Sequence, residues 1–308
     1  MTEPRGRRLR GADVGIPPRQ LDFQLPAQLP RWMYADNRTA TTYLAVLSAF
    51  FPPGEEFFVR SVQRFAAGVT DPVLRARVAG FTAQEVIHGR EHDRLNELLR
   101  ERGFHLEVAE KAIVVALALL ERLPARQRLA CTAFMEHFTA VLAEETLAAE
   151  DAGKGYIHPD LNELWLWHAL EELEHKSVSY EVYEKIGNRW PERLLAEPLV
   201  LATVGPALVA SWVWLLATEG ALVRPGDVAE GLKLMFGPGR SCAPCSPSCR
   251  CSAAATSTRL VGTPRRWSSA GGSCCSVRRA RCGGSCAVPR SRPPGRLRAK
   301  VIRWIWNA

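Results

Sequence analysis

Residues 1–239 contain a single cysteine, Cys131, although the whole chain has nine. One thiol in a body of that size is what a reducing compartment allows. An apolar run is also missing after the basic RGRRLR near the N-terminus, so the sequence indicates no secretory signal. We therefore expect a cytoplasmic protein.

Acidic residues are absent from residues 240–308, which hold fourteen of the forty lysines and arginines. Residues 1–239 therefore carry 26 basic side chains against 32 acidic ones. The net charge of +8 resembles that of a nucleic-acid-binding protein, but the main part of the chain is negative. We expect no nucleic-acid partner.

The segment 240–308 also has its own composition. It holds the other eight cysteines and shows no helical or strand periodicity until RLRAKVIRWIWNA at its end. We interpret it as an out-of-frame translation of a GC-rich gene, because codons shifted by one base give such a restricted alphabet. The alternatives are a disordered Arg/Ser-rich arm and a zinc knuckle at Cys242, Cys245, Cys249 and Cys251.

Strand patterns are missing from residues 36–239, where apolar residues recur at helical spacing. Residues 1–35, rich in proline, predict an extended N-terminal arm on this helical domain. Pro52-Pro53-Gly54 predicts an interruption of the first helix, which resumes through GEEFFVRSVQRF. The other helices are predicted from Pro72 to Gly103, Leu106 to Leu123, Ala125 to Asp151 and Asp160 to Gly187. The sequence thus predicts an all-α fold, an antiparallel bundle.

Charged residues are also missing from residues 198–218, a stretch long enough to cross a bilayer. Pro198 and Gly205-Pro206 predict kinks in it. We favour a helix that covers the bundle or contacts a membrane surface over one that spans a membrane.

Histidine is scarce, with seven in the chain, yet two Glu-x-x-His motifs occur. They are Glu85 with His88 and Glu172 with His175, and each lies on the apolar stripe of its predicted helix. A buried carboxylate is unfavourable unless it is paired, hydrogen-bonded or bound to a cation. Residues i and i+3 are neighbours on a helix, so each motif can offer both side chains to one metal ion.

Two further helices each supply a glutamate. Glu55 shares an apolar stripe with Phe51 and Phe58, and Glu136 shares a face with small alanines. The resulting order is Glu, Glu-x-x-His, Glu, Glu-x-x-His, which suits a site for two metal ions in a bundle of two helical hairpins. The longer interval between Glu85 and Glu136 leaves room for a crossover helix over residues 106–123.

These motifs resemble those of a known superfamily. FFPPGEEFFVRSVQRF, FTAQEVIHGREH, MEHFTAVLAE and WHALEELEHKSVSYEVY are similar to segments of the ferritin-like di-iron carboxylate proteins, within a bacterial family called predicted metal-dependent hydrolases. The resemblance covers about Leu21 to Gly239, and it implies a ferritin-like four-helix bundle with one long crossover helix and appended C-terminal helices.

His168 extends the second motif to His-x-x-x-Glu-x-x-His, which is similar to the histidine-rich site of arylamine N-oxygenases. That resemblance implies seven metal ligands: Glu55, Glu85, His88, Glu136, His168, Glu172 and His175.

The neighbouring polar residues have more than one interpretation. His168 either binds metal or forms a hydrogen bond with Glu172 or Glu171, and His92 either binds metal or orients a ligand. Glu171, Glu174, Glu91 and Arg90 form a charged outer face or contact the ligands from outside. His137 is turned about 100° from Glu136 on its helix and is not expected to be a ligand.

Mixed carboxylate and imidazole ligands suit two iron ions, or iron with manganese. Our first hypothesis is an enzyme that uses dioxygen to oxidise a small organic substrate. No G-x-G-x-x-G motif opens a strand, so electrons would come from a separate donor. The second hypothesis is a hydrolase in which two metals share a hydroxide nucleophile, and the third is a non-catalytic metal-binding bundle.

Overall fold

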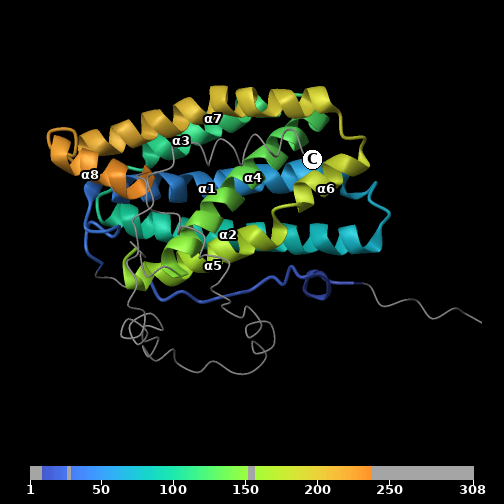
Figure 1. The fold of residues 1–308 in the computed structure, drawn as a ribbon, viewed down its shortest axis with the longest axis horizontal. Helices are drawn as coiled ribbons and strands as arrows, with labels where there is room; N and C mark the ends of the chain where they lie inside the picture. The colour runs from blue at the N-terminus through green and yellow to red at the C-terminus, as the bar shows by residue number, and fades with distance from the viewer. Residues whose placement is uncertain (1–8, 26–28, 152–156, 237–308) are drawn as a thin grey trace, which may run out of the picture. The chain divides into compact units, whose positions relative to one another are not determined.

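The structure is a computed structural model, and it describes residues 9–25, 29–151 and 157–236 (Figure 1). The predicted boundary near Gly239 and all three interpretations of residues 240–308 lie outside these residues. Within them the regular structure is helical, apart from one isolated β-bridge between Tyr34 and Ile157. The elements are η1 (Gly11–Val14), α1 (Arg38–Ala66), α2 (Pro72–Glu101), α3 (Glu107–Glu121), α4 (Ala125–Asp151), α5 (Pro159–His175), α6 (Val178–Lys185), α7 (Trp190–Thr218) and α8 (Pro225–Phe236).

Four long helices form the bundle. α1 packs along α2, and α4 packs along α5. The two pairs contact each other where α1 meets α4 and where α2 meets α5. α3 is the predicted crossover helix, because it joins α2 to α4 and packs on α1 and α7 (Figure 1). The prediction of an all-α bundle with a crossover helix and appended C-terminal helices is confirmed.

The predicted interruption of the first helix is wrong, since α1 continues through Pro52 and Pro53. Pro52 has no N–H, so it cannot donate to the carbonyl of Ser48, four residues earlier in the helix. Asn96 of α2 supplies a donor instead, because its Nδ2 lies 3.1 Å from the Ser48 carbonyl oxygen. A contact between helices therefore replaces a bond within the helix.

The prediction of one helix from Asp160 to Gly187 is also wrong. α5 ends at His175, and α6 begins at Val178 after a turn. Ser177 precedes α6, and its hydroxyl donates to Glu181 at 2.6 Å and accepts from Arg77 of α2 at 2.9 Å. A serine side chain can form local polar contacts that compete with helical hydrogen bonds. Here they accompany a turn between α5 and α6, although the apolar residues keep their helical spacing.

α7 covers the bundle, as one of the expectations for residues 198–218 stated. It packs on α3, α4 and α1, and the indole N–H of Trp212 donates to the carbonyl of Thr39 in α1. By length and composition α7 is also long and apolar enough to cross a membrane, and 22% of its most apolar window is buried. Its other side exposes apolar residues such as Val209 and Trp214. Contact with a membrane surface stays a prediction.

The described part of the N-terminal arm lies against α2. Ile16 is fully buried there, and it follows the short helix η1. The approach is so close that a Cβ on Gly80 would lie 2.7 Å from the Ile16 carbonyl oxygen and 2.9 Å from the Ile16 Cβ. Only glycine at position 80 leaves room for this contact.

Gly80→Ala should therefore destabilise the protein by about 1–3 kcal/mol, because the added methyl group overpacks the contact between the arm and α2. Gly205→Ala is the matched control, since it also lies inside a helix but has no atom within 4 Å of the added Cβ. The control should be neutral or more stable by up to about 1 kcal/mol. Denaturant unfolding measures both, and equal stability of the two variants would contradict the packing described.

Candidate metal centre

Four glutamates and four histidines point into the centre of the bundle. The glutamates come one each from α1, α2, α4 and α5, and the histidines come two each from α2 and α5. None of the eight is more than 4% exposed: Glu55, Glu85, Glu136, Glu172, His88, His92, His168 and His175. Among the residues that the structure describes, no lysine or arginine forms an ion pair with any of these four glutamates.

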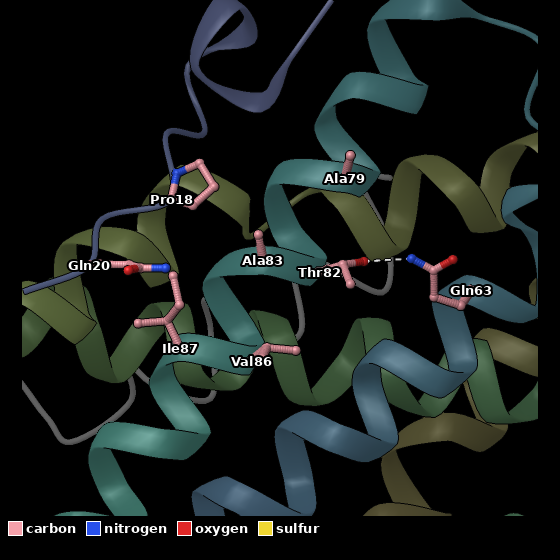
Figure 2. A pocket seen from close by; sticks show the side chains of 8 residues that line it. All are labelled: Pro18, Gln20, Gln63, Ala79, Thr82, Ala83, Val86 and Ile87. Carbon is pink, nitrogen blue, oxygen red and sulfur yellow. Dashed lines mark hydrogen bonds between the residues drawn. The ribbon is translucent and has the colours of Figure 1, made fainter.

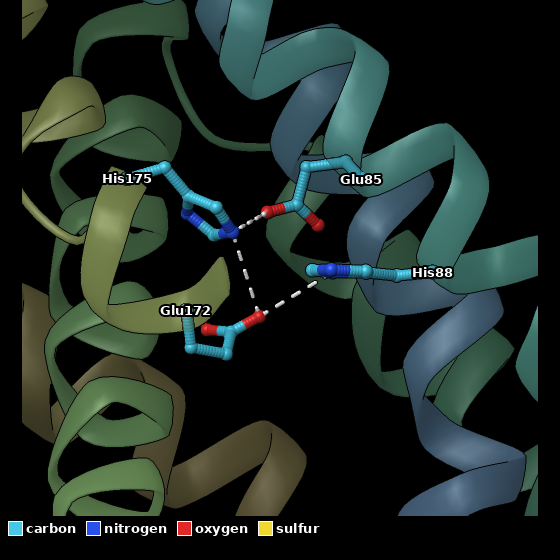
Figure 3. A group of neighbouring side chains, drawn as sticks. All are labelled: Glu85, His88, Glu172 and His175. Atoms are coloured by element: carbon cyan, nitrogen blue, oxygen red, sulfur yellow. Dashed lines mark ion pairs between the residues drawn. The ribbon is translucent and has the colours of Figure 1, made fainter. Parts of the chain in front are cut away.

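The two Glu-x-x-His motifs meet, as their inward stripes predicted (Figure 3). One ligand atom from each of Glu85, His88, Glu172 and His175 lies within 4.8 Å of the other three. His175 Nε2 is 3.3 Å from Glu85 Oε1 and 3.7 Å from Glu172 Oε1. His88 Nδ1 is 3.7 Å from the same Glu172 oxygen. Two residue types that bind metal thus converge from two helices.

A second group adjoins the first. Ligand atoms of Glu55, His88 and His168 also lie within 4.8 Å of one another. His168 Nε2 is 3.1 Å from Glu172 Oε1, so Glu172 contacts both groups. Glu136 lies outside both groups and reaches the cluster through His175, whose Nδ1 is 3.2 Å from Glu136 Oε2. All seven predicted ligands are therefore gathered in one place, while their binding of metal stays a prediction.

The three histidines among the predicted ligands share one arrangement. In each, one ring nitrogen contacts a partner outside the two groups: Glu171 for His88, His92 for His168 and Glu136 for His175. The other ring nitrogen is buried and has no hydrogen-bond partner. Both carboxylate oxygens of Glu55 and Glu85 and Oε1 of Glu136 are also buried without a partner.

Buried polar atoms normally have hydrogen bonds, so a convergent set without them needs an explanation. Imidazole nitrogens and carboxylate oxygens are ligands for iron, manganese and zinc, and a histidine that binds metal usually donates its other N–H to a carboxylate or another acceptor. The donor set and its unpartnered atoms fit metal ions.

The N-terminal arm contributes to this arrangement through Arg19. Its guanidinium contacts Glu171 at 2.9 Å and Glu174 at 2.6 Å. Glu171 in turn lies 3.1 Å from His88 Nε2. An ionised Glu171 paired with Arg19 accepts the His88 Nε2–H, which leaves His88 Nδ1 bare on the side of the cluster. Glu171 is therefore a contact of a candidate ligand, one of the two roles expected for it.

Sequence reasoning missed Arg19, Ser48 and Asn96. Arg19 lies in an arm without periodicity, so no pattern indicated its contact with Glu171. Ser48 contacts His92, Asn96 contacts Ser48, and both residues carry a usable signal. Ser48 is seven residues before Glu55, and Asn96 is four after His92, so both share a helical face with a candidate ligand.

Burial and mutual repulsion perturb the carboxyl groups. Burial, followed by the neighbouring glutamates, raises the pKa of Glu55 and of Glu85 well above the ordinary value. Burial also raises the pKa of Glu136 to about 7, against the opposing effect of His175. Burial would raise the pKa of Glu172 too, but its contacts with His175, His168 and His88 outweigh it and lower that pKa. Protons and metal ions therefore compete for this site.

The histidines are perturbed in both directions. Burial, and then the neighbouring His168, holds the pKa of His88 and of His92 well below the ordinary value. Burial would lower the pKa of His175 as well, but Glu172 and Glu136 outweigh it and raise that pKa. A neutral His88 keeps a lone pair for a metal ion.

Two hollows on the described surface are separate from the buried cluster. The larger, of about 490 Å³, lies between the arm, α1 and α2 (Figure 2). The smaller, of about 200 Å³, lies beside it. No residue of the buried cluster lines either one. The larger is lined by Pro18, Gln20, Gln63, Ala79, Thr82, Ala83, Val86 and Ile87.

Comparison with known proteins identifies a family. The family described as "Predicted metal-dependent hydrolase" matches residues 17–250. The match includes every member of the buried cluster, and it ends eleven residues beyond the end at Gly239 that the sequence resemblance suggested. No curated protein and no solved structure matches the chain.

The metal-free protein should lose stability as the pH rises from about 6.5 to 8.5, by on the order of 1–3 kcal/mol. Glu55, Glu85, Glu136 and His175 have raised pKa values, so at the start of this range the folded state holds protons that the unfolded glutamates have already lost, and it must release them as the pH rises. The lowered pKa values of His88 and His92 make the stability rise with pH, but only below about pH 6.5. Above that pH both rings are neutral in the folded and in the unfolded protein. Urea unfolding at several pH values measures the effect.

The double variant Glu55→Gln/Glu85→Gln should weaken this dependence without abolishing it, because its two amides do not titrate whereas Glu136 and His175 still do. A metal-free protein whose stability stays constant or rises over the same range would contradict these pKa shifts.

Gly89→Ala should weaken metal binding about tenfold without weakening the fold. An added Cβ would lie 3.2 Å from Glu55 Oε2, so the carboxylate must move, whereas alanine favours a helix interior over glycine. Gly54→Ala is the matched control, because it adjoins Glu55 but has no atom within 4 Å of its added Cβ. Competition with a metal chelator measures affinity, and equal affinities of the two variants would contradict this placement of Glu55.

Proposed function

The chain belongs to the predicted metal-dependent hydrolase family, and we propose that it is an enzyme with two metal ions bound between α1, α2, α4 and α5. The observation that carries the proposal is the convergence of buried, unpartnered carboxylate oxygens and imidazole nitrogens. In this proposal Glu55, His88 and His168 hold one ion, and Glu85, Glu172 and His175 hold the other. Glu172 contacts histidines of both sets, so it would be shared by the two sets of ligands.

Ligand chemistry supports iron at both positions, or iron with manganese. Carboxylates and imidazoles together suit these ions, and the described cluster offers no thiolate. Such a pair supplies Lewis-acid activation of water and substrate, or electrons for the reduction of dioxygen. Its place in a helical bundle also agrees with the resemblance to the ferritin-like di-iron carboxylate proteins.

We assign hydrolysis as the first reaction class, because the family description supports it. Hydrolysis needs a group that accepts the proton of the attacking water. Glu136 suits this role, since its pKa is about 7 and its Oε1 is buried without a hydrogen-bond partner. Its Oε2 meanwhile contacts His175 and keeps that ring in place.

Oxidation of a small organic substrate by dioxygen is the second candidate, and the burial of the site favours it. No candidate ligand is more than 4% exposed, and dioxygen is small and apolar enough to reach such a centre. The histidine content also agrees with the resemblance to arylamine N-oxygenases. In this case an external donor would supply electrons to the site.

The purified full chain should contain about two metal ions, and Glu85→Ala and His175→Ala should each lose most of the bound metal. His105→Ala is the control, because His105 is exposed and lies outside the cluster. Elemental analysis with a protein assay measures the ratio. Metal content that is the same in all four proteins would overturn the proposed centre.

A second measurement separates the reaction classes. The metal-loaded protein is given a panel of carboxylic and phosphoric esters without dioxygen, and its dioxygen consumption is measured separately with a reductant present. Ester cleavage that Glu136→Gln slows by about a hundredfold or more supports hydrolysis. Metal-dependent consumption of dioxygen without ester cleavage supports oxidation. A metal-loaded protein that does neither is a non-catalytic metal-binding bundle.

A further inference from the structure

A chain of hydrogen bonds begins at the position where α1 passes through its prolines. Pro52 leaves the carbonyl of Ser48 without a helical donor, and Asn96 Nδ2 donates to it at 3.1 Å. A carbonyl oxygen only accepts hydrogen bonds, so the amide nitrogen of Asn96 must face it. The amide oxygen, Oδ1, must then face the Ser48 hydroxyl, which lies 2.7 Å away.

The direction of the next two hydrogen bonds follows from the first. The Ser48 hydroxyl has one proton, and it donates that proton to Asn96 Oδ1. At its contact with His92 Nδ1, 3.0 Å away, Ser48 Oγ must therefore accept, so His92 carries a proton on Nδ1. His92 is fully buried, and its ring nitrogens contact Ser48 and His168 rather than a carboxylate, so the ring is neutral and its Nε2 is bare.

His168 is the last residue of this series of hydrogen bonds. His92 Nε2 lies 2.7 Å from His168 Nδ1, and a bare Nε2 can only accept. His168 therefore carries a proton on Nδ1, and a neutral His168 presents an unprotonated Nε2 to Glu172 and Glu55, whose Oε1 atoms are 3.1 and 4.0 Å away. Acceptors that face one another at these distances repel unless a cation lies among them.

Aromatic side chains surround His92 and His168. The Phe51 ring lies 4.7 Å from the His92 ring and 4.5 Å from the His168 ring, between centroids. The Trp165 ring lies 5.2 Å from that of His92. His92 and His168 therefore have few other partners, and their tautomers depend on the hydrogen bonds that start at Asn96.

We propose that Asn96, Ser48 and His92 are positioning residues that fix the tautomer of His168 and so aim a bare Nε2 at the metal centre. For two neutral rings, the proton positions follow from the hydrogen bonds. Only the role of the bare nitrogen as a metal ligand rests on the proposed function. Loss of these hydrogen bonds would free His168 to carry its proton on Nε2 and donate it to Glu172, which removes a metal ligand.

Nitrogen-15 NMR of histidine-labelled, metal-free protein tests the proton positions directly. At about pH 8.5 we expect His92 and His168 to be protonated on Nδ1 alone, with signals assigned from His92→Gln and His168→Gln. Ser48→Ala removes the acceptor for His92 Nδ1–H and should shift His168 toward protonation on Nε2. A His168 that in the parent protein carries a proton on Nε2, alone or with Nδ1, overturns the proposal.

Metal titration tests the consequence. His92→Phe should weaken the binding of one of two cobalt ions by about 10–100-fold and change the visible absorption of bound cobalt. His92→Gln is the conservative control, because its amide oxygen can still accept from His168 Nδ1–H, and it should stay within a few-fold of the parent. Ser48→Ala, which removes a single oxygen atom, should weaken the same ion if His92→Phe does not fold.

These results separate the two proposals. Parent-like cobalt binding in both His92→Phe and Ser48→Ala overturns the positioning role. Expected tautomers in a parent protein that binds no cobalt overturn the metal centre but leave the hydrogen-bond chain in place.

Discussion

The structure depends on the burial of four glutamates without a lysine or arginine partner among the described residues. Moving a carboxylate from water into a protein interior is unfavourable by several kcal/mol, and four that lie close together also repel one another. The nearby basic side chains are histidines, and burial lowers the pKa values of His88 and His92, which favours their neutral forms. Burial and repulsion raise the pKa values of Glu55 and Glu85, and the protons that these carboxyl groups therefore keep reduce the repulsion in the metal-free protein. In the proposed centre metal ions would remove it more completely, because one divalent ion offsets two carboxylates and would fill the unpartnered positions of the imidazoles.

Some contacts both hold the helices together and position the candidate ligands. Asn96 replaces the donor that Pro52 lacks and so keeps α1 continuous up to Glu55, and the same amide sets the direction of the hydrogen bonds that end at His168. Arg19 ties the N-terminal arm to α5 through Glu171, and Glu171 orients His88. The loss of one contact would therefore disturb both the helix packing and one candidate ligand. This coupling explains how a buried site retains a specific geometry while its carboxylates repel one another.

Patterns within single helices predicted the all-α fold and the convergence of both Glu-x-x-His motifs, because helical periodicity determines which residues share a face. The errors occurred where a distant residue decides the local structure. Pro52 stops a helix unless a donor from another helix replaces its missing N–H, and that donor, Asn96, lies 44 residues away in the sequence. The break at Ser177 depends on Arg77, and the role of Glu171 depends on Arg19. The sequence also places Glu136 with the ligands by spacing alone, whereas its contact with His175 required coordinates.

The most direct test of the central claim is anomalous X-ray diffraction from crystals of the metal-loaded protein, recorded at the absorption edge of the bound metal. The account predicts two strong peaks inside the bundle, one at bonding distance from His88 Nδ1 and His168 Nε2 and one at bonding distance from His175 Nε2. Metal peaks confined to the surface, with Glu55, Glu85 and Glu172 hydrogen-bonded to one another in the interior, would contradict it.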